Sequence, residues 1–119
     1  MQCKKILVVE DDARLRQMIE KVFDLSNIEV EIAGNGKEAL DYLKENMPPA
    51  LILLDLMMPV MSGPEFVARL NEEGRLTDIP IVLMSALPIE KAHNPYDLPV
   101  LMKPLRLQTL VDLGNKYCR

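Results

Sequence analysis

The chain has 119 residues, of which 49% are hydrophobic and 27% charged, a composition typical of a single globular domain. Its net charge is −4, and no stretch gathers five or six like charges, which argues against nucleic-acid binding. No uncharged stretch approaches the roughly 20 residues of a membrane span, and no signal peptide is recognisable. Cys3 and Cys118 have neither the spacing of a disulfide framework nor that of zinc ligands, so we expect neither feature. We therefore expect a cytoplasmic chain that does not contact a membrane.

Short apolar runs alternate with helical patterns along the chain. In chain order, the expected strands are Ile6–Val9, Ile28–Ile32, Ala50–Leu54, Ile79–Met84 and Leu98–Met102. Apolar stripes at i, i+3 and i+4 predict helices around residues 15–22, 39–43, 66–70 and 107–114. The second run alternates with glutamates and the fifth contains Pro99, so we place both at sheet edges. The alternation predicts one α/β domain over residues 1–119, a five-stranded parallel sheet with helices on both faces.

Polar side chains follow four of these runs, at the carboxyl ends of the expected strands. They are Glu10, Asp11 and Asp12 after the first run, Asp55 after the third, Ser85 after the fourth and Lys103 after the fifth. Ligands of open parallel sheets bind outside these carboxyl ends, so we expect the side chains to converge at one edge.

This set of groups suits phosphoryl chemistry around a hard divalent ion. Carboxylates packed together repel unless a cation lies among them, and Mg²⁺ bound by carboxylates, water and phosphate is the best fit. One carboxylate could then attack a phosphoryl group while the ammonium and the hydroxyl bind its oxygens, forming an aspartyl phosphate. Each residue alone has a simpler explanation, since Asp11, Asp12 or Ser85 could cap a helix and Lys103 could be solvated.

Four motifs together resemble the receiver domain of two-component response regulators over essentially the whole chain. They are VVEDD at Val8–Asp12, LLDLMMPVMSG at Leu53–Gly63, MSA at Met84–Ala86 and KP at Lys103–Pro104. The resemblance implies a flavodoxin-like, doubly wound sheet of order 2-1-3-4-5, and a switch rather than an enzyme acting on other substrates. It also implies that Pro59 and Gly63 form the tight turn after the acceptor.

The resemblance assigns a role to each candidate residue. Asp55 is the phosphoryl acceptor, and Glu10, Asp11, Asp55 and the backbone carbonyl of Met57 are Mg²⁺ ligands. Ser85 is the switch hydroxyl. Lys103 is the phosphate-binding lysine, and its bond to Pro104 is expected to be cis. A histidine kinase or histidine phosphotransfer protein donates the phosphoryl group and a downstream protein responds, while no output domain is expected in this chain.

The chain departs from the family between Ser85 and Lys103. The interval is about four residues shorter than usual and contains Pro88, Pro95 and Pro99, so we expect the fourth helix of the family to be short, displaced or absent. Val100 replaces the usual aromatic residue three positions before the lysine. Signal output is therefore expected to use another element, and we favour the loop Ala86–Tyr96.

Two other functions fit parts of the pattern. A pseudo-receiver would keep the fold and act through protein contacts alone, but it would not need Glu10, Asp55 and Lys103 together. A Mg²⁺ phosphohydrolase with an aspartyl nucleophile normally has a second Asp two residues later, where this chain has Met57. His93 is interpreted as a surface residue and the methionines around Pro59 as packing residues.

Overall fold

The computed structural model describes residues 5–118 and contains one parallel sheet in the order β2-β1-β3-β4-β5. The strands are β1 (Ile6–Val9), β2 (Val30–Ala33), β3 (Leu51–Asp55), β4 (Ile81–Ser85) and β5 (Val100–Met102). The predicted sheet and its strand order are confirmed, and so is the placement of the second and fifth strands at the two edges.

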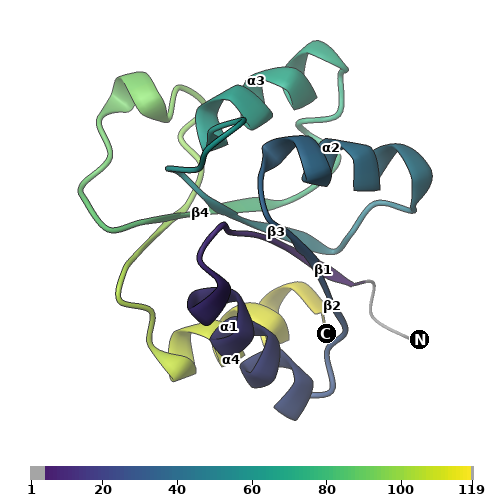
Figure 1. The fold of residues 1–119 in the computed structure, drawn as a ribbon, viewed down its shortest axis with the longest axis vertical. Coiled ribbons are helices and arrows are strands. Elements are labelled where there is room, and N and C mark those ends of the chain that lie inside the picture. The colour runs from purple at the N-terminus through teal and green to yellow at the C-terminus, as the bar shows by residue number, and fades with distance from the viewer. Residues whose placement is uncertain (1–4, 119) are drawn as a thin grey trace.

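Four α-helices cover the two faces of the sheet. They are α1 (Ala13–Leu25), α2 (Gly36–Glu45), α3 (Gly63–Glu72) and α4 (Leu107–Cys118). Helices α1 and α4 lie together on one face, and α2 and α3 lie together on the other (Figure 1). Right-handed crossovers place a helix on one face where the chain moves from β1 to β2, and on the other face where it moves back to β3 and on to β4.

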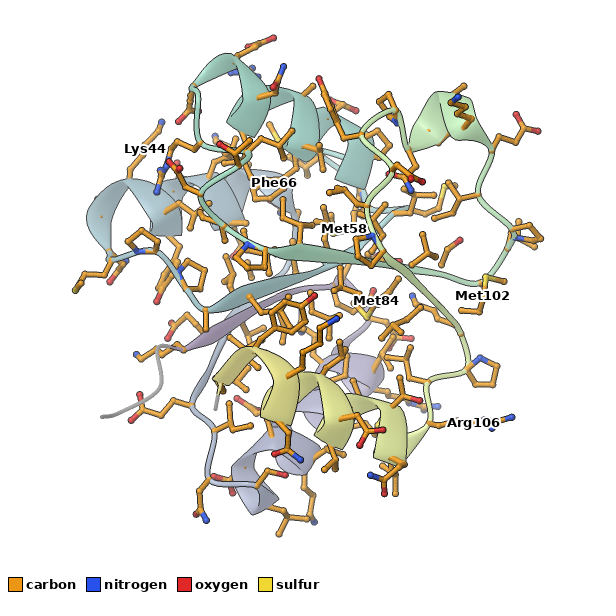
Figure 2. The ribbon with its side chains drawn as sticks, turned by 180° about the vertical axis from the view of Figure 1, so that it is seen from behind. Lys44, Met58, Phe66, Met84, Met102 and Arg106 are labelled. Atoms are coloured by element: carbon orange, nitrogen blue, oxygen red, sulfur yellow. The ribbon has the colours of Figure 1, made fainter. Side chains whose placement is uncertain are left out.

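The hydrophobic core is divided in two by the sheet, because successive residues of a strand point to opposite faces. Leu7 and Val9 pack with Phe66 of α3, whereas Ile6 and Val8 belong to the cluster under α1 and α4. Figure 2 shows Phe66 and Met84 on opposite sides of the sheet. Every residue of β1, β3 and β4 is buried, so the carboxyl ends of these strands are held rigidly.

Prolines account for the late starts of two strands, β4 and β5. β4 begins at Ile81 instead of Ile79, and the Pro80 carbonyl accepts a hydrogen bond from the Ile52 amide. β5 begins at Val100, directly after Pro99, which has no amide hydrogen for the ladder. These two strands therefore start after their prolines, while β5 ends at Met102 as predicted and β4 ends one residue later than predicted, at Ser85.

The segment between β4 and β5 contains no α-helix. Within it, the structure has only the short 3₁₀ helix Lys91–His93. The Asn94 side chain closes the second half of the segment, since its amide donates to the Leu98 carbonyl and accepts from the Leu98 amide, both at 2.9 Å. The fourth helix of the family was expected to be short, displaced or absent, and the segment between β4 and β5 has no α-helix.

Two expectations from composition have different outcomes. None of the helices in residues 5–118 is long and apolar enough to cross a membrane. Cys118, at the end of α4, is disulfide-bonded, so the expectation that disulfide bonding plays no part is wrong for this residue. The other cysteine of the sequence, Cys3, lies outside the described residues.

Candidate functional site

The predicted functional residues meet at the carboxyl edge of the sheet because of the strand register. Val9 is paired with Leu54, so the residues that follow them in the chain, Glu10 and Asp55, are neighbours. Ser85 ends β4 beside Met102, which precedes Lys103. Four separate stretches of sequence are thereby brought to one edge, as expected from their positions after the apolar runs.

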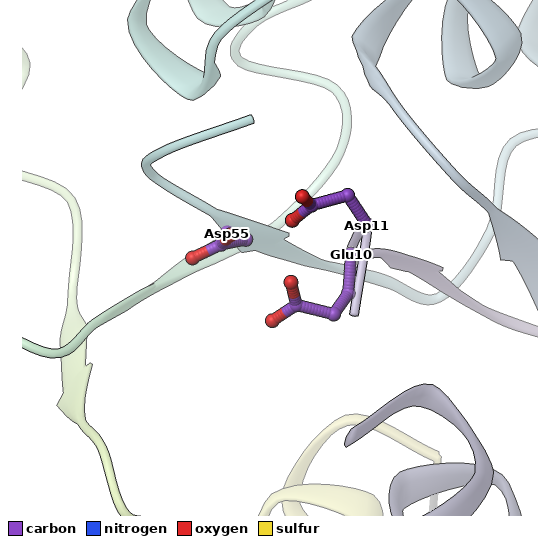
Figure 3. Close-up of side chains that lie close together, drawn as sticks. All are labelled: Glu10, Asp11 and Asp55. Atoms are coloured by element: carbon purple, nitrogen blue, oxygen red, sulfur yellow. The ribbon is translucent and has the colours of Figure 1, made fainter. Parts of the chain in front are cut away.

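Three carboxylates form a cluster at this edge. Glu10, Asp11 and Asp55 each place a carboxylate oxygen within 4.8 Å of the others (Figure 3). Glu10 is 1% exposed and Asp55 is 4% exposed, whereas Asp11 is exposed to solvent. Oxygen donors from several carboxylates, one of them open to solvent, suit a hard divalent cation that keeps part of its water shell. The side chains present therefore fit a metal ion.

Lys103 supplies positive charge to the two buried carboxylates. Its Nζ donates hydrogen bonds to Glu10 Oε1 at 2.8 Å and to Asp55 Oδ1 at 3.0 Å. The peptide bond between Lys103 and Pro104 is cis, as expected from the sequence. The lysine side chain is 23% exposed and forms ion pairs with both carboxylates. It is therefore close enough to Asp55 to contact an anion bound there.

Burial and hydrogen bonding shift the pKa values of Glu10 and Lys103. Burial raises the pKa of Glu10 from 4.5 to about 7, and the nearby Asp55 charge adds to this, against the lowering effect of the Lys103 hydrogen bond. For Lys103, burial alone would lower the pKa, but the hydrogen bonds to Glu10 and Asp55 outweigh it and raise the pKa above its usual value. The charged form of Glu10 is therefore unfavourable at this site, and an additional cation near the carboxylates would stabilise it.

Asp12 does not join the carboxylate cluster. It is the N-cap of α1, and its side chain accepts hydrogen bonds from the amides of Arg14 at 2.9 Å and Leu15 at 3.4 Å. The helix-capping alternative considered for this residue is thus confirmed. Arg16 of the same helix, which the sequence did not single out, donates to the Glu10 carbonyl at 3.1 Å.

The Ser85 hydroxyl is buried and faces the following loop. Its Oγ donates to the Leu87 carbonyl at 2.6 Å and accepts from the Leu87 amide at 3.2 Å. These two bonds fold the start of the 86–90 segment against the end of β4. Ser85 lies at the predicted end of β4, and its hydroxyl proton is donated to the Leu87 carbonyl of the loop.

The loop after Asp55 is tightly constrained. A Cβ atom on Gly63 would lie 2.8 Å from the Asp55 carbonyl oxygen, and the Gly63 amide donates to the Leu56 carbonyl at 3.0 Å. The glycine expected in this turn is therefore required by the close approach of the two backbones.

The methionines of this loop differ from one another. Met58 and Met61 pack against the core, as expected, but Met57 is 76% exposed, so the packing interpretation is wrong for it. The Met57 side chain extends into solvent, whereas the side chain of the preceding residue, Leu56, is buried. His93 is exposed, in agreement with its interpretation as a surface residue.

Comparison with known proteins places this site in a family context. The sequence profile of the response regulator receiver domain matches residues 6–113. The response regulator Rre1 of Synechocystis sp. is 34% identical over 82 residues, covering 68% of this chain and 35% of that protein. The sensor histidine kinase TmoS of Ectopseudomonas mendocina is 39% identical over 87 residues, covering 73% of this chain and 9% of that protein. The chain thus spans about a third or less of the length of these curated relatives.

The likeness extends to solved structures. The chemotaxis protein CheY4 of Vibrio cholerae superposes with a TM-score of 0.84 at 28% identity, covering 97% of this chain and 98% of that one. The match therefore spans the whole sheet, including the edge where the carboxylates lie.

Proposed function

Because the chain belongs to the response regulator receiver domain family, we propose that it is a signalling switch that accepts a phosphoryl group on Asp55. The donor is a histidine kinase or a histidine phosphotransfer protein, and the modified edge of the sheet changes the affinity for a downstream protein. The proposal includes the cytoplasmic location expected from the sequence. It assigns no catalysis on other substrates to the chain.

The observation that carries the proposal is the pairing of Asp55 with Lys103. The Lys103 ammonium lies 3.0 Å from Asp55 Oδ1, so it is placed to bind an oxygen of a phosphoryl group carried by that carboxylate. In the reaction, an oxygen of Asp55 attacks phosphorus while the bond between phosphorus and the donor imidazole breaks. The electron pair returns to the imidazole nitrogen, and Lys103 binds an oxygen of the transferred group.

We assign a Mg²⁺ site to Glu10, Asp11, Asp55 and the backbone carbonyl of Met57. Support comes from the three carboxylate oxygens within 4.8 Å of one another. When bound, the ion supplies positive charge for the phosphoryl oxygens. Ion binding favours the charged form of Glu10, whose pKa is raised by burial, and Asp11 lies on the solvent-exposed side of the proposed site.

Intact-mass spectrometry tests the proposal directly. The purified chain is incubated with phosphoramidate, a small donor with a phosphorus–nitrogen bond, with Mg²⁺ or with EDTA. We expect a mass gain of one phosphoryl group that requires Mg²⁺ and is lost in Asp55→Asn. A chain that gains no mass from phosphoramidate or from any phosphohistidine protein would instead be a pseudo-receiver.

A further inference from the structure

A cavity of about 230 Å³ lies between α3 and the segment that connects β4 with β5. Figure 1 shows this segment, which includes the short 3₁₀ helix, beside α3. Residues of α3 form one wall of the cavity, and residues 92–98 form much of the other. The cavity therefore belongs to the interval in which the chain departs from its family, since the structure has no α-helix there.

The walls of the cavity are mainly apolar. Among residues 5–118, no acidic residue, lysine or arginine lines it. A charged molecule would lose its hydration here without gaining an opposite charge, whereas an uncharged molecule avoids this cost and gains from apolar contact. The apolar lining includes Leu56, Pro64, Val67, Ala68, Leu83 and Leu98.

The size of the cavity and its other lining residues favour a single substituted ring. A cavity of roughly 150 Å³ holds benzene, while pockets for drug-sized ligands begin at about 300 Å³. The rings of His93 and Tyr96 line the cavity, and aromatic rings pack well against one another. Within residues 5–118, neither of these side chains forms a hydrogen bond or an ion pair, so both are available to a polar substituent. The Asn94 amide, by contrast, is already bonded to Leu98.

Two lining residues connect the cavity to the surroundings of Ser85. Leu56 and His93 also line the neighbouring cavity of about 250 Å³, which includes Ser85. The loop that separates β4 from the 3₁₀ helix is fixed at its start by the two hydrogen bonds between Ser85 and Leu87. A molecule bound between α3 and the β4–β5 segment contacts both, so it binds more tightly while the segment keeps this conformation.

We propose that this cavity binds a small, uncharged aromatic molecule with one polar substituent, and that the bound molecule holds the β4–β5 segment in its unphosphorylated conformation. Such a molecule opposes the response to phosphorylation, because the Ser85 hydroxyl has to leave Leu87 in order to donate to a phosphoryl oxygen. The binding site is independent of the proposed function, whereas its regulatory effect rests on it. The two parts are therefore tested separately.

Benzamide is the probe for the binding site, since it is one uncharged ring with one amide group. Titration of the isotope-labelled protein, followed by amide chemical shifts, should show saturable binding with a Kd of about 1 mM or tighter. Ala68→Phe and Ala92→Phe each add a ring to one wall, and each should weaken binding by about tenfold or more because the ring fills space that the probe needs. Arg69→Phe is the matched control. It adds the same ring at the next, exposed position of α3, outside the lining residues, and should leave the Kd unchanged.

Benzoate and benzamidine test the requirement for an uncharged molecule. Both nearly match benzamide in shape, but at neutral pH benzoate is an anion and benzamidine is a cation. We expect each to bind about tenfold more weakly than benzamide, or weaker still, because neither finds an opposite charge on the cavity walls. Equal binding of all three compounds would contradict the proposed class of ligand.

Beryllofluoride, a mimic of the phosphoryl group, tests the regulatory effect. With Mg²⁺ present, benzamide should bind the beryllofluoride-treated protein about fivefold or more weakly than the untreated protein. By reciprocity, benzamide should weaken beryllofluoride binding by the same factor. Ser85→Ala has no hydroxyl to move between Leu87 and the phosphoryl oxygen, so it should lose most of this difference.

Each other outcome contradicts a specific statement. Absence of saturable benzamide binding overturns the site, and so does binding that both phenylalanine variants of the cavity leave unchanged. A dimer that Ala68→Phe disrupts in sedimentation would make the cavity a contact between two copies, which also overturns the small-molecule site. Equal benzamide affinity with and without beryllofluoride overturns the regulatory effect alone. If phosphoramidate transfers no phosphoryl group and beryllofluoride changes no amide signal, the proposed function fails, while the cavity site still stands or falls by benzamide binding.

Discussion

The ammonium of Lys103 lies 2.8 Å from Oε1 of Glu10, a carboxylate that is 1% exposed. The same ammonium contacts Asp55, so one lysine balances two buried acids. The lysine therefore contacts oxygens of two carboxylates that belong to the proposed Mg²⁺ site. Under that assignment the ion and the ammonium compete for the same negative charge, and this competition can be measured.

Lys103→Ala is expected to strengthen Mg²⁺ binding by removing a competing cation, while it disables the response to phosphorylation. Isothermal titration calorimetry with Mg²⁺ measures the first effect, and amide exchange with beryllofluoride measures the second. Lys116→Ala, which removes an exposed lysine near the end of α4, is the control and should match the unchanged protein. Weaker Mg²⁺ binding in Lys103→Ala would show that the lysine organises the metal site instead of competing with the ion.

Asp11→Asn should weaken Mg²⁺ binding and phosphorylation together. Asp11 is the exposed member of the carboxylate cluster, and the carboxylates that Lys103 contacts are those of Glu10 and Asp55, so the charge of Asp11 is available to an ion. We expect at least about a tenfold loss of Mg²⁺ affinity, since changes even in outer-shell partners cost about 10–100-fold. Asp12→Asn is the matched control, because that residue caps α1 and an amide can also cap a helix. An unchanged Mg²⁺ titration in Asp11→Asn would remove this residue from the ligand set.

The stability of the metal-free protein should fall as pH rises from about 5 to 7. Burial raises the pKa of Glu10 from 4.5 to about 7, so between these values the folded state binds more protons than the unfolded state. The free energy of unfolding must then decrease with pH in this window, by up to about 3 kcal/mol.

Urea unfolding in EDTA at several pH values measures this decrease. Glu10→Gln should lack it, because the amide does not titrate. Mg²⁺ should reduce it in the unchanged protein, because the ion favours the charged carboxylate. A stability that rises over the same window in EDTA would contradict the direction of the Glu10 shift.

The phosphorylated chain is expected to be long-lived. By resemblance to the family, Met57 and Leu87 flank the path of the attacking water, and neither side chain can orient water by hydrogen bonding. Met57→Asn should therefore shorten the half-life of the phosphoprotein by about tenfold or more, since positioned polar groups contribute at least that much to proton-transfer steps. Loss of radioactive phosphate with time provides the measurement. An already unstable phosphoprotein, unaffected by Met57→Asn, would contradict the assignment.

The loop 86–96 should respond most strongly to phosphorylation. Ser85 has a single hydroxyl proton, which is donated to the Leu87 carbonyl, so the hydroxyl must leave the loop in order to donate to a phosphoryl oxygen. Val100 has no aromatic ring to follow this movement. Hydrogen exchange with Mg²⁺, with and without beryllofluoride, should show its largest change in residues 86–96.

Ser85→Ala should lose most of that change. A response confined to residues 105–116 in the unchanged protein would place the switch in α4 instead.

The sheet and the set of site residues could be predicted from the sequence because both depend on local patterns. An apolar run such as Ile6–Val9 encodes a buried strand wherever it packs, and a polar residue directly after it must lie at the carboxyl end. Parallel strands share this end, so Asp55 and Lys103 could be placed at one edge without knowledge of the packing. The short interval rich in prolines likewise indicated the missing helix between β4 and β5.

Other properties were decided by the tertiary structure, because they depend on contacts between distant segments. The raised pKa of Glu10 follows from burial by surrounding elements, and the direction of the Ser85 hydroxyl follows from the loop that folds back on it. Val60 has no local signal for a positive φ, since a valine after a proline suggests extended backbone. Its turn is imposed because the Gly63 amide must reach the Leu56 carbonyl, which closes the loop around it.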